Sequence, residues 1–473
     1  MYKILTCLLI IFFNRSNYIT VAPKKNILLI CIDDLRPELA SFGATYIHSP
    51  NIDKLAQNGH AFHNHYVNAP SCGPSRYTLL TGTYGRPGND ALFERSEKLK
   101  SGNNVNPSMP EWFKQHGYTT VSIGKVSHYP GGLGGVDWNN PNSIEMPNAW
   151  DKSLMPVAEW KHPRGAMHGL ANGETRGQKG TMAVFQSEKG NDSIYPDGHI
   201  TNEALLEIER LSNFETPFFL AVGLIKPHLP FGAPKQYIDL YENVSTPPIP
   251  SPEKPNYPST WHKSSEFFQY NTWNKDPRND RDFAENVRRH YAACVSYVDA
   301  QVGKIIKKLH DVGLQNNTLI VLWGDHGWSL GDHNIWGKHN LFEEALRSPL
   351  IIVDPSNTLK KHTNAIVETV DIFPTLCEMS NISVPSFING VSLKPILTDA
   401  NAKGHHAFSY NGKGKSIRTE NYRCTQLKSG HYELYNHVID PFETKNIALE
   451  YPEIVAQLSN IIKQKALIQK TND

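Results

Sequence analysis

A run of seven uncharged residues, Asn26-Ile-Leu-Leu-Ile-Cys-Ile32, ends directly at two adjacent acids, Asp33 and Asp34. An apolar run of this length without alternation is typical of a strand that is buried on both faces of a parallel sheet. In open α/β sheets, ligands bind beyond the carboxyl ends of the strands. The sequence therefore predicts that both acids lie at the ligand-binding edge of a central sheet.

Similar apolar runs recur along the chain and predict further strands. They cover residues 119–123, 218–224, 318–323 and 350–353, and helical patterns cover 202–211 and 291–309. A helix is also expected to begin after Ser49, because Pro50 suits the first helical turn. Strands that alternate with helices predict a doubly wound α/β fold.

Two long segments interrupt this pattern, residues 131–192 and 245–281. Both are rich in residues that favour irregular structure, such as glycine, proline and asparagine. Long irregular insertions in a compact enzyme often wall a substrate cleft. We therefore expect these two segments to border the functional site.

The two ends of the chain differ from its middle. We interpret residues 1–22 as a secretory signal peptide, because the apolar run 4–13 follows Lys3 and is too short to span a bilayer. This predicts export to the periplasm or the extracellular space, and no other stretch approaches the ~20 apolar residues of a membrane span.

The main domain is predicted over 23–395. Residues 396–473, with short alternating stretches and a helix near 452–465, are predicted to form a small α+β subdomain with an antiparallel sheet.

Composition excludes several classes of protein. The 473 residues carry 47 Lys and Arg against 46 Asp and Glu, a net charge of +1, which argues against broad electrostatic binding of nucleic acid. The 6 cysteines form no CxxC pair and no tight spacing, so the chain is not a disulfide scaffold. A globular protein with a sizeable core remains.

The segment Pro70-Ser-Cys-Gly-Pro-Ser-Arg76 leads into an apolar helical run. This order would place the side chain of Cys72 at a helix N-terminus, where backbone N–H groups and the helix dipole favour anions. Arg76 would add a cation one turn further on. Taken alone, the pattern also fits a small buried cysteine at the start of a helix.

A third polar cluster, Trp323-Gly-Asp-His-Gly-Trp328, follows the predicted strand at 318–323, with Lys338 beyond it. Asp325 and His326 would thus lie at another strand end, close to Asp33 and Asp34. Three converging carboxylates repel one another unless a cation lies among them. Oxygen-rich ligation favours calcium or magnesium over zinc. The alternative is that each acid separately caps a loop.

Two stretches of the chain, residues 70–82 and 117–128, resemble the signatures of the type I sulfatases. Residues 70–82 resemble the first signature, in which the cysteine of Cys-x-Pro-Ser-Arg is oxidised after translation to formylglycine (3-oxoalanine). Residues 117–128 resemble the second, although Ser127 stands where the family usually has an aromatic residue. The resemblance covers nearly all of the mature chain and is closest to the iduronate-2-sulfatase branch. The further stretches that carry it are 33–37, 49–53, 218–223, 226–231, 296–303 and 325–331.

The resemblance implies the fold of alkaline phosphatase, with a central mixed sheet flanked by helices and a small α+β C-terminal subdomain. It implies one bound Ca²⁺, with the ligands Asp33, Asp34, Asp325, His326 and the formylglycine formed from Cys72. It also assigns Arg76, Lys125, His128, His228 and Lys338 to the pocket around the sulfate.

The implied reaction uses the two hydroxyls of the hydrated aldehyde at residue 72. One attacks sulfur while the alcohol leaves, and the other then expels sulfate and regenerates the aldehyde. Arg76, Lys125 and Lys338 would neutralise the sulfuryl oxygens. His128 is the candidate base for the second hydroxyl, and either His228 or Lys338 would protonate the departing sugar oxygen.

The implied substrate is a sulfated glycan, either a 2-O-sulfated uronic acid at a chain end or a fragment of an algal polysaccharide such as ulvan. Its biosynthetic partner would be a formylglycine-generating enzyme or an anaerobic sulfatase maturase. Two alternatives stay open at this point. A phosphonate or phosphate monoester hydrolase of the same superfamily carries the same cysteine motif, and a non-catalytic binder of sulfated glycans would leave Cys72 unmodified.

Overall fold

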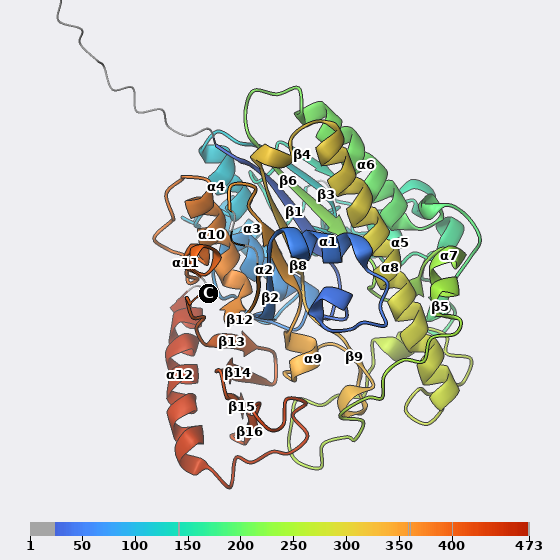
Figure 1. Ribbon diagram of the computed structural model, residues 1–473, viewed down its shortest axis with the longest axis vertical. Coiled ribbons are helices and arrows are strands. Elements are labelled where there is room, and N and C mark those ends of the chain that lie inside the picture. Colours follow the sequence, from blue (N-terminus) through green and yellow to red (C-terminus); the bar gives the residue numbers. More distant parts are fainter. Residues whose placement is uncertain (1–23, 141, 358, 360, 400, 472–473) are drawn as a thin grey trace, which may run out of the picture.

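An eight-stranded sheet lies at the centre of the computed structural model, which describes residues 24–140, 142–357, 359, 361–399 and 401–471 (Figure 1). The predicted signal peptide lies outside the described residues. The strand order is β12-β2-β11-β8-β1-β6-β3-β4. The bounds are β1 (Asn26–Ile32), β2 (His60–Tyr66), β3 (Thr119–Gly124), β4 (Lys152–Leu154), β6 (Phe218–Leu224), β8 (Thr318–Gly324), β11 (Leu350–Val353) and β12 (Lys361–Glu368). Among these described strands only β11 runs antiparallel to its neighbours, so the sheet is mixed.

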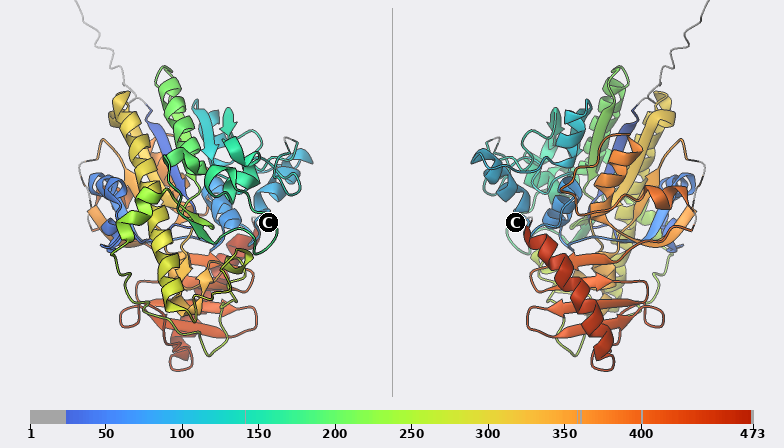
Figure 2. Two further views of the ribbon diagram at one scale, coloured as in Figure 1. Left: turned by 90° about the vertical axis from the view of Figure 1, so that its right-hand side faces the viewer. Right: turned by 90° about the vertical axis from the view of Figure 1, so that its left-hand side faces the viewer.

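Strand β1 is buried on both faces, as its sequence predicts. Leu28, Ile30 and Ile32 pack in one core, whereas Ile27, Leu29 and Cys31 pack in another, because successive side chains of a strand point to opposite faces. The first core is covered by α1 (Pro50–Asn58), α6 (Pro196–Leu211) and α8 (Arg281–Asp311). The second is covered by α2 (Cys72–Thr81), α4 (Met109–Gln115), α10 (Ile372–Met379) and α11 (Lys394–Thr398). Helices α6 and α8 run side by side along their face (Figure 2).

The smaller elements lie mostly in the connections. The remaining helices of the main body are α3 (Ala91–Lys100), α5 (Pro163–Met167), α7 (Lys235–Ile238) and α9 (Glu343–Leu346). Two two-stranded sheets pair β5 (Phe185–Gln186) with β7 (Phe231–Gly232) and β9 (Ser329–Leu330) with β10 (Trp336–Gly337). The predicted insertion at 131–192 is not wholly irregular, because it contributes β4 to the edge of the main sheet. None of the described helices is long and apolar enough to cross a membrane.

The C-terminal part forms an antiparallel sheet of β13 (Ala407–Tyr410), β14 (Gly414–Arg418), β15 (Tyr422–Leu427) and β16 (Tyr432–Asn436), against which α12 (Pro452–Thr471) packs. Figure 1 shows α12 along the outer side of this sheet. The predicted antiparallel sheet with one helix is confirmed, and β13 is an additional strand. The boundary between 395 and 396 stays a prediction, and α11 spans that position.

A buried ion-pair network joins this C-terminal sheet to the main body. Arg423 on β15 is 0% exposed and pairs with Glu343 of α9 at 2.5 Å and with Glu443. His437 lies 2.8 Å from the same carboxylate of Glu443. A buried charge that loses its partner is costly, so Arg423 couples the two parts of the fold.

We expect Arg423→Met to lower the free energy of unfolding by about 3–5 kcal/mol, because Glu343 and Glu443 would be left buried without their cation. Urea denaturation monitored by fluorescence measures this loss. The control is Arg210→Met, whose partially exposed ion pair with Glu207 (2.8 Å) contributes at most about 1 kcal/mol. Equal losses in both variants would contradict the coupling role.

Candidate active site

Four predicted metal ligands meet where β1 and β8 end side by side. The two strands are parallel neighbours in register, with Ile32 opposite Gly324, so the residues that follow them emerge together. The backbone N–H of Asp34 donates to Asp325 at 2.9 Å, and His326 Nε2 lies 3.3 Å from Asp34. The side chains of Asp33, Asp34, Asp325 and His326 are all fully buried. Asp34 adopts a left-handed backbone conformation (φ 57°), which aspartate tolerates better than most residues.

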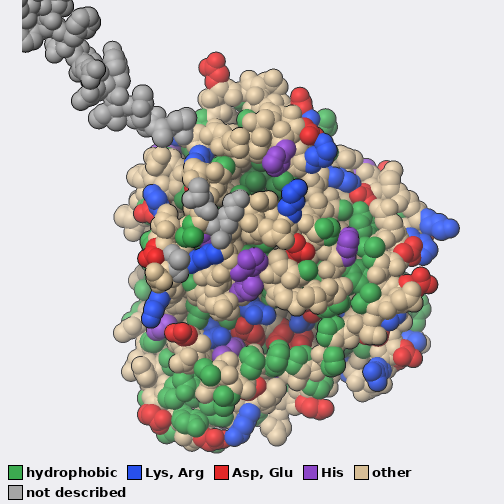
Figure 3. All heavy atoms as spheres, viewed as in Figure 1, with side chains coloured by type: hydrophobic (Ala, Val, Ile, Leu, Met, Phe, Trp, Pro, Cys, Tyr) green, Lys and Arg blue, Asp and Glu red, His purple; other side chains and the backbone are tan. Residues whose placement is uncertain are grey.

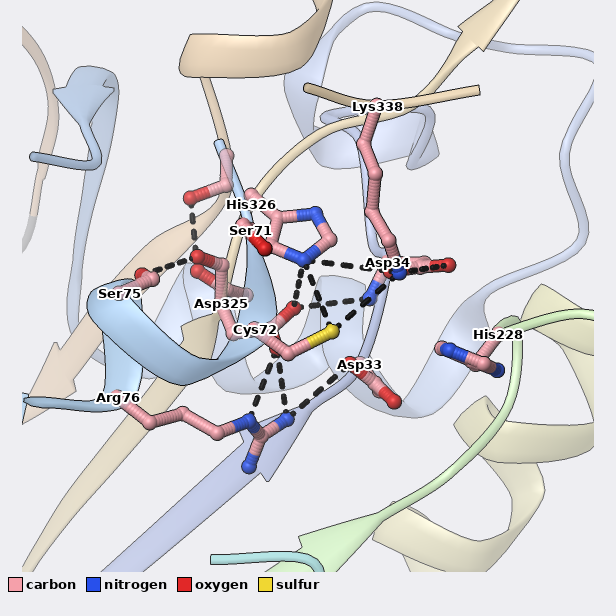
Figure 4. A network of polar contacts seen from close by, with 12 residues as sticks. Asp33, Asp34, Ser71, Cys72, Ser75, Arg76, His228, Asp325, His326 and Lys338 are labelled. Carbon is pink, nitrogen blue, oxygen red and sulfur yellow. Dashed lines mark hydrogen bonds and ion pairs between the residues drawn. The ribbon is translucent and has the colours of Figure 1, made fainter. Parts of the chain in front are cut away.

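Cys72 is the first residue of α2 and faces this cluster (Figure 4). Its sulfur lies 3.3 Å from Lys338 Nζ and 3.4 Å from His326 Nε2. Burial alone would raise the pKa of the thiol, but the charges of Lys125 and Lys338 hold that pKa well below its ordinary value. The position at the start of a helix, beside two ammonium groups, therefore favours an anion at residue 72.

The acids around Cys72 fit a divalent cation. One candidate oxygen, nitrogen or sulfur atom from each of Asp33, Cys72, Asp325 and His326 lies within 4.8 Å of the others, and Asp34 belongs to an overlapping group. Burial and the charge of Asp33 raise the pKa of Asp325 to about 7, and burial raises the pKa of Asp34 as well. Carboxylates that repel one another in a buried site, with mainly oxygen donors, suit a hard ion such as calcium or magnesium.

Arg76 and Lys125 lie beneath the acids and hold them in place. The Arg76 guanidinium contacts Asp325 at 2.8 Å and Asp33 at 3.3 Å, and also donates to the carbonyl of Val126 at 3.1 Å. The ammonium of Lys125 pairs with the other oxygen of Asp33. Burial alone would raise the pKa of Asp33, but these cations keep it below its usual range. In this arrangement Arg76 positions the carboxylates.

His128 follows β3 and is buried close to Cys72 and Lys125. Burial lowers its pKa, so the neutral imidazole is favoured. Glu145 accepts the backbone N–H of Tyr129, the residue that follows His128, at 2.6 Å, and Ser127, the departure from the second signature, lies close to this carboxyl. Burial raises the pKa of Glu145 to about 7. Glu145 thus helps to fix the loop that carries His128.

His228 and Lys338 approach the same site from the opposite side and share one carboxylate, that of Glu266. The distances to Glu266 Oε1 are 3.8 Å from His228 Nε2 and 3.4 Å from Lys338 Nζ. Burial and the neighbouring lysines lower the pKa of His228 to about 4. Burial alone would raise the pKa of Glu266, but Lys338 and His339 hold it well below its usual range. Glu266 therefore stays ionised between the two candidate acids.

The structure brings all of the predicted site residues together, and it adds three that the sequence did not single out. Glu145, His168 and Glu266 all come from the two insertions, which have no motif that marks them. The His168 ring lies 5.3 Å from that of His228, and its Nδ1 is 3.2 Å from the hydroxyl of Tyr270. The sequence pointed to these three residues only indirectly, because it predicted that the two insertions border the site.

We expect Glu266→Gln to lower kcat by roughly tenfold with a smaller change in KM, because the neutral amide no longer attracts the Lys338 ammonium that lies between it and Cys72. Steady-state kinetics with a small ester substrate measures the change, and Glu266→Asp should restore part of the rate. Glu174→Gln, a change in the other insertion, is the control. An unchanged kcat in Glu266→Gln would remove this residue from the site.

The chain is similar to sulfatases over most of its length. The sequence profile of the family described as "Sulfatase" matches residues 25–382, and that of "N-sulphoglucosamine sulphohydrolase, C-terminal" matches 331–468. Iduronate 2-sulfatase of Mus musculus is 34% identical over 401 residues, which are 76% of this chain and 69% of the mouse protein. A sulfatase of Formosa agariphila is 31% identical over 466 residues, or 95% of this chain and 87% of that protein.

Solved structures share the fold. The phosphonate monoester hydrolase of Agrobacterium radiobacter superimposes with a TM-score of 0.74 at 21% identity, covering 94% of this chain and 96% of that one. The predicted alkaline-phosphatase-like architecture, a mixed sheet between helices with a C-terminal sheet subdomain, is thereby confirmed. A fold in common at this identity does not specify a substrate.

Proposed function

The chain belongs to the sulfatase family and is a sulfuric ester hydrolase, and from that premise we propose that it removes the 2-O-sulfate of a uronic acid in a sulfated glycan. The mouse relative, whose name specifies iduronate 2-sulfate, supports this substrate class. The substrate would be a glycosaminoglycan fragment or an ulvan fragment. We further propose that the enzyme is exported and acts outside the cytoplasm.

The observation that carries the proposal is the set of cations and imidazoles around residue 72. Lys125, His128, His228 and Lys338 are all buried next to it and come from three segments of the chain. Two ammonium groups and two imidazoles around the candidate nucleophile suit a substrate with a sulfate and a carboxylate on one sugar.

The site residues suit two groups that the family generally uses. Asp33, Asp34, Asp325, His326 and residue 72 would hold Ca²⁺, which when bound supplies positive charge at a sulfate oxygen and at the nucleophile. Oxidation of Cys72 to formylglycine supplies, in its hydrate, two hydroxyls on one carbon.

The other side chains of the site would assist this reaction. Arg76 keeps Asp33 and Asp325 aligned, and Lys125 and Lys338 neutralise the sulfuryl oxygens. His128 takes a proton from residue 72, and His228 or Lys338, both held by Glu266, gives one to the leaving sugar oxygen.

We expect His128→Ala to lower kcat by roughly 10²-fold and to produce a burst of about one alcohol per enzyme molecule, because only the second half of the cycle loses its base. Rapid-quench measurement of the alcohol released from an aryl sulfate detects the burst. The exposed His362, changed to alanine, is the control. Normal turnover without a burst would refute this role for His128.

The decisive test is sulfate release by protein that is co-expressed with a formylglycine-generating enzyme. Two substrates are compared in the presence of calcium: a disaccharide that ends in 2-sulfated iduronate, and ulvan oligosaccharides. Release from the first supports the proposed substrate, and release only from the second moves the substrate to the algal polysaccharide. Release from neither, in protein shown by peptide mass to carry formylglycine at residue 72, would contradict the proposal.

The same preparation tests the alternatives. Faster turnover of an aryl phosphate than of an aryl sulfate would identify a phosphate or phosphonate monoester hydrolase. A peptide mass with intact cysteine at residue 72, from cells that contain an active maturation enzyme, would instead support a non-catalytic binder.

A further inference from the structure

A lysine-lined groove lies on the C-terminal subdomain, between α12 and the ends of β14 and β15. It has a volume of about 600 Å³, and Lys415, Lys428, Lys463 and Lys470 line it. Among the described residues that line it, none is acidic. The protein as a whole has a net charge of only +1, so this concentration of positive charge is local.

The floor of the groove is apolar and open. Leu427 of β15 and Ile462 of α12 are nearly buried, whereas Leu467 of α12 is 65% exposed. The lysines at 428, 463 and 470 are exposed, and within the described chain no ion pair neutralises them. A groove that combines aliphatic surface with several unneutralised ammonium groups is suited to an extended polyanion.

This groove shares one lining residue with a depression beside the candidate active site. Asn411, in the β13–β14 turn, lines both the groove and a second depression that also contains Ser71 and His339. Ser71 precedes Cys72 and His339 follows Lys338 in the chain. The amide of Asn411 donates to the carbonyl of His339 at 3.0 Å, which fixes the turn against the site. Figure 3 shows charged side chains gathered in the hollow between the main body and this subdomain.

We propose that the groove is a binding site for the remainder of a sulfated oligosaccharide whose terminal residue occupies the active site. The inference rests on the proposed function and extends it, because it makes the enzyme selective for longer, more highly sulfated chains. Sulfate groups several sugars away from the scissile ester would pair with Lys428, Lys463 and Lys470. The sugar rings would cover Leu427 and Leu467.

The test compares substrate lengths in a variant that lacks three of these charges. The variant is Lys428→Gln, Lys463→Gln and Lys470→Gln, and the control changes Lys54, Lys304 and Lys307, on α1 and α8, to glutamine. The control removes the same charge, and its lysines lie on elements of the main body that do not line the groove. The measured quantity is kcat/KM for a sulfated disaccharide and for a sulfated decasaccharide, at several salt concentrations.

We expect the groove variant to lose about tenfold in kcat/KM on the decasaccharide, chiefly in KM, and to keep its rate on the disaccharide. The advantage of the long substrate over the short one should also depend less on salt in this variant. An unchanged decasaccharide rate, or an equal loss in the control, would overturn the proposal.

A binding measurement separates this proposal from the proposed function. In Cys72→Ala protein, calorimetry with a sulfated decasaccharide should show about tenfold weaker binding when the three groove lysines are also changed. This result would stand even if the enzyme proved to hydrolyse another ester. If the short substrate is hydrolysed but the decasaccharide binds equally with and without the lysines, the groove proposal fails and the proposed function does not.

Discussion

Replacing Cys72 with alanine will lower sulfate-ester hydrolysis by roughly 10⁴-fold or more, the largest effect that we expect from any single change. The side chain lies at the first position of α2, within 3.4 Å of both Lys338 and His326, and no other described nucleophile occupies this place. Its removal would eliminate the proposed nucleophile while leaving the neighbouring cations in place. The measurement is sulfate release from protein co-expressed with the maturation enzyme, for which Cys72→Ala should retain substrate binding.

A matched control uses another buried cysteine. Cys294 lies within α8 and is also fully buried, but it packs in the apolar core. Cys294→Ala removes a thiol of the same size, so its rate should stay within about twofold once the protein is folded. If Cys72→Ala kept a rate close to that of this control, residue 72 could not be the nucleophile.

The second large effect is expected at Asp325. Asp325→Asn should lower activity by about 10³-fold and should abolish the rise in Tm that we expect calcium to produce in the unchanged protein. An ion at 100 times its Kd would stabilise the native state by about 2.7 kcal/mol, so its loss is measurable by thermal unfolding without any assay of activity. The physical reason is that one of three buried carboxylates of the candidate metal centre becomes neutral.

Asp299→Asn provides the comparison for this variant. Asp299 is also a buried carboxylate, but it accepts backbone N–H groups of α1 at Asn51 and Ile52 and lies outside the candidate metal centre. Its substitution should lower Tm and leave the response to calcium intact. A full calcium response in Asp325→Asn would show that Asp325 is not a ligand.

Much of the fold could be predicted from the sequence because the central strands are apolar on both faces. The runs at 26–32 and 218–224 match β1 and β6 to the residue. The reversed direction of β11 could not be predicted, since a four-residue apolar run has the same pattern in either direction. The helix predicted over 291–309 is longer in the structure, where α8 begins at Arg281. Its first turns carry many charged residues, which obscure the amphipathic period.

The candidate site was predicted unevenly for a similar reason. Residues at strand ends and helix starts, such as Asp33, Cys72 and Asp325, have a place that local sequence fixes. Glu266 and His168 lie in irregular segments, and only the packing of distant loops brings them to His228. Hydrophobic periodicity reflects only the local backbone, so contacts between distant loops cannot be predicted from it.

The burial of Cys72 bears on whether its oxidation comes before or after folding. The thiol is only 2% exposed, and the C-terminal subdomain lines a depression next to it together with Ser71 and Pro74. A separate enzyme needs access to several residues around a side chain that it oxidises, and the folded chain offers none at this depth. We therefore expect the oxidation to precede folding, so that residue 72 is converted while the last strands and α12 are still being made. Protein that folds first with intact cysteine would then stay inactive, however much maturation enzyme is added afterwards.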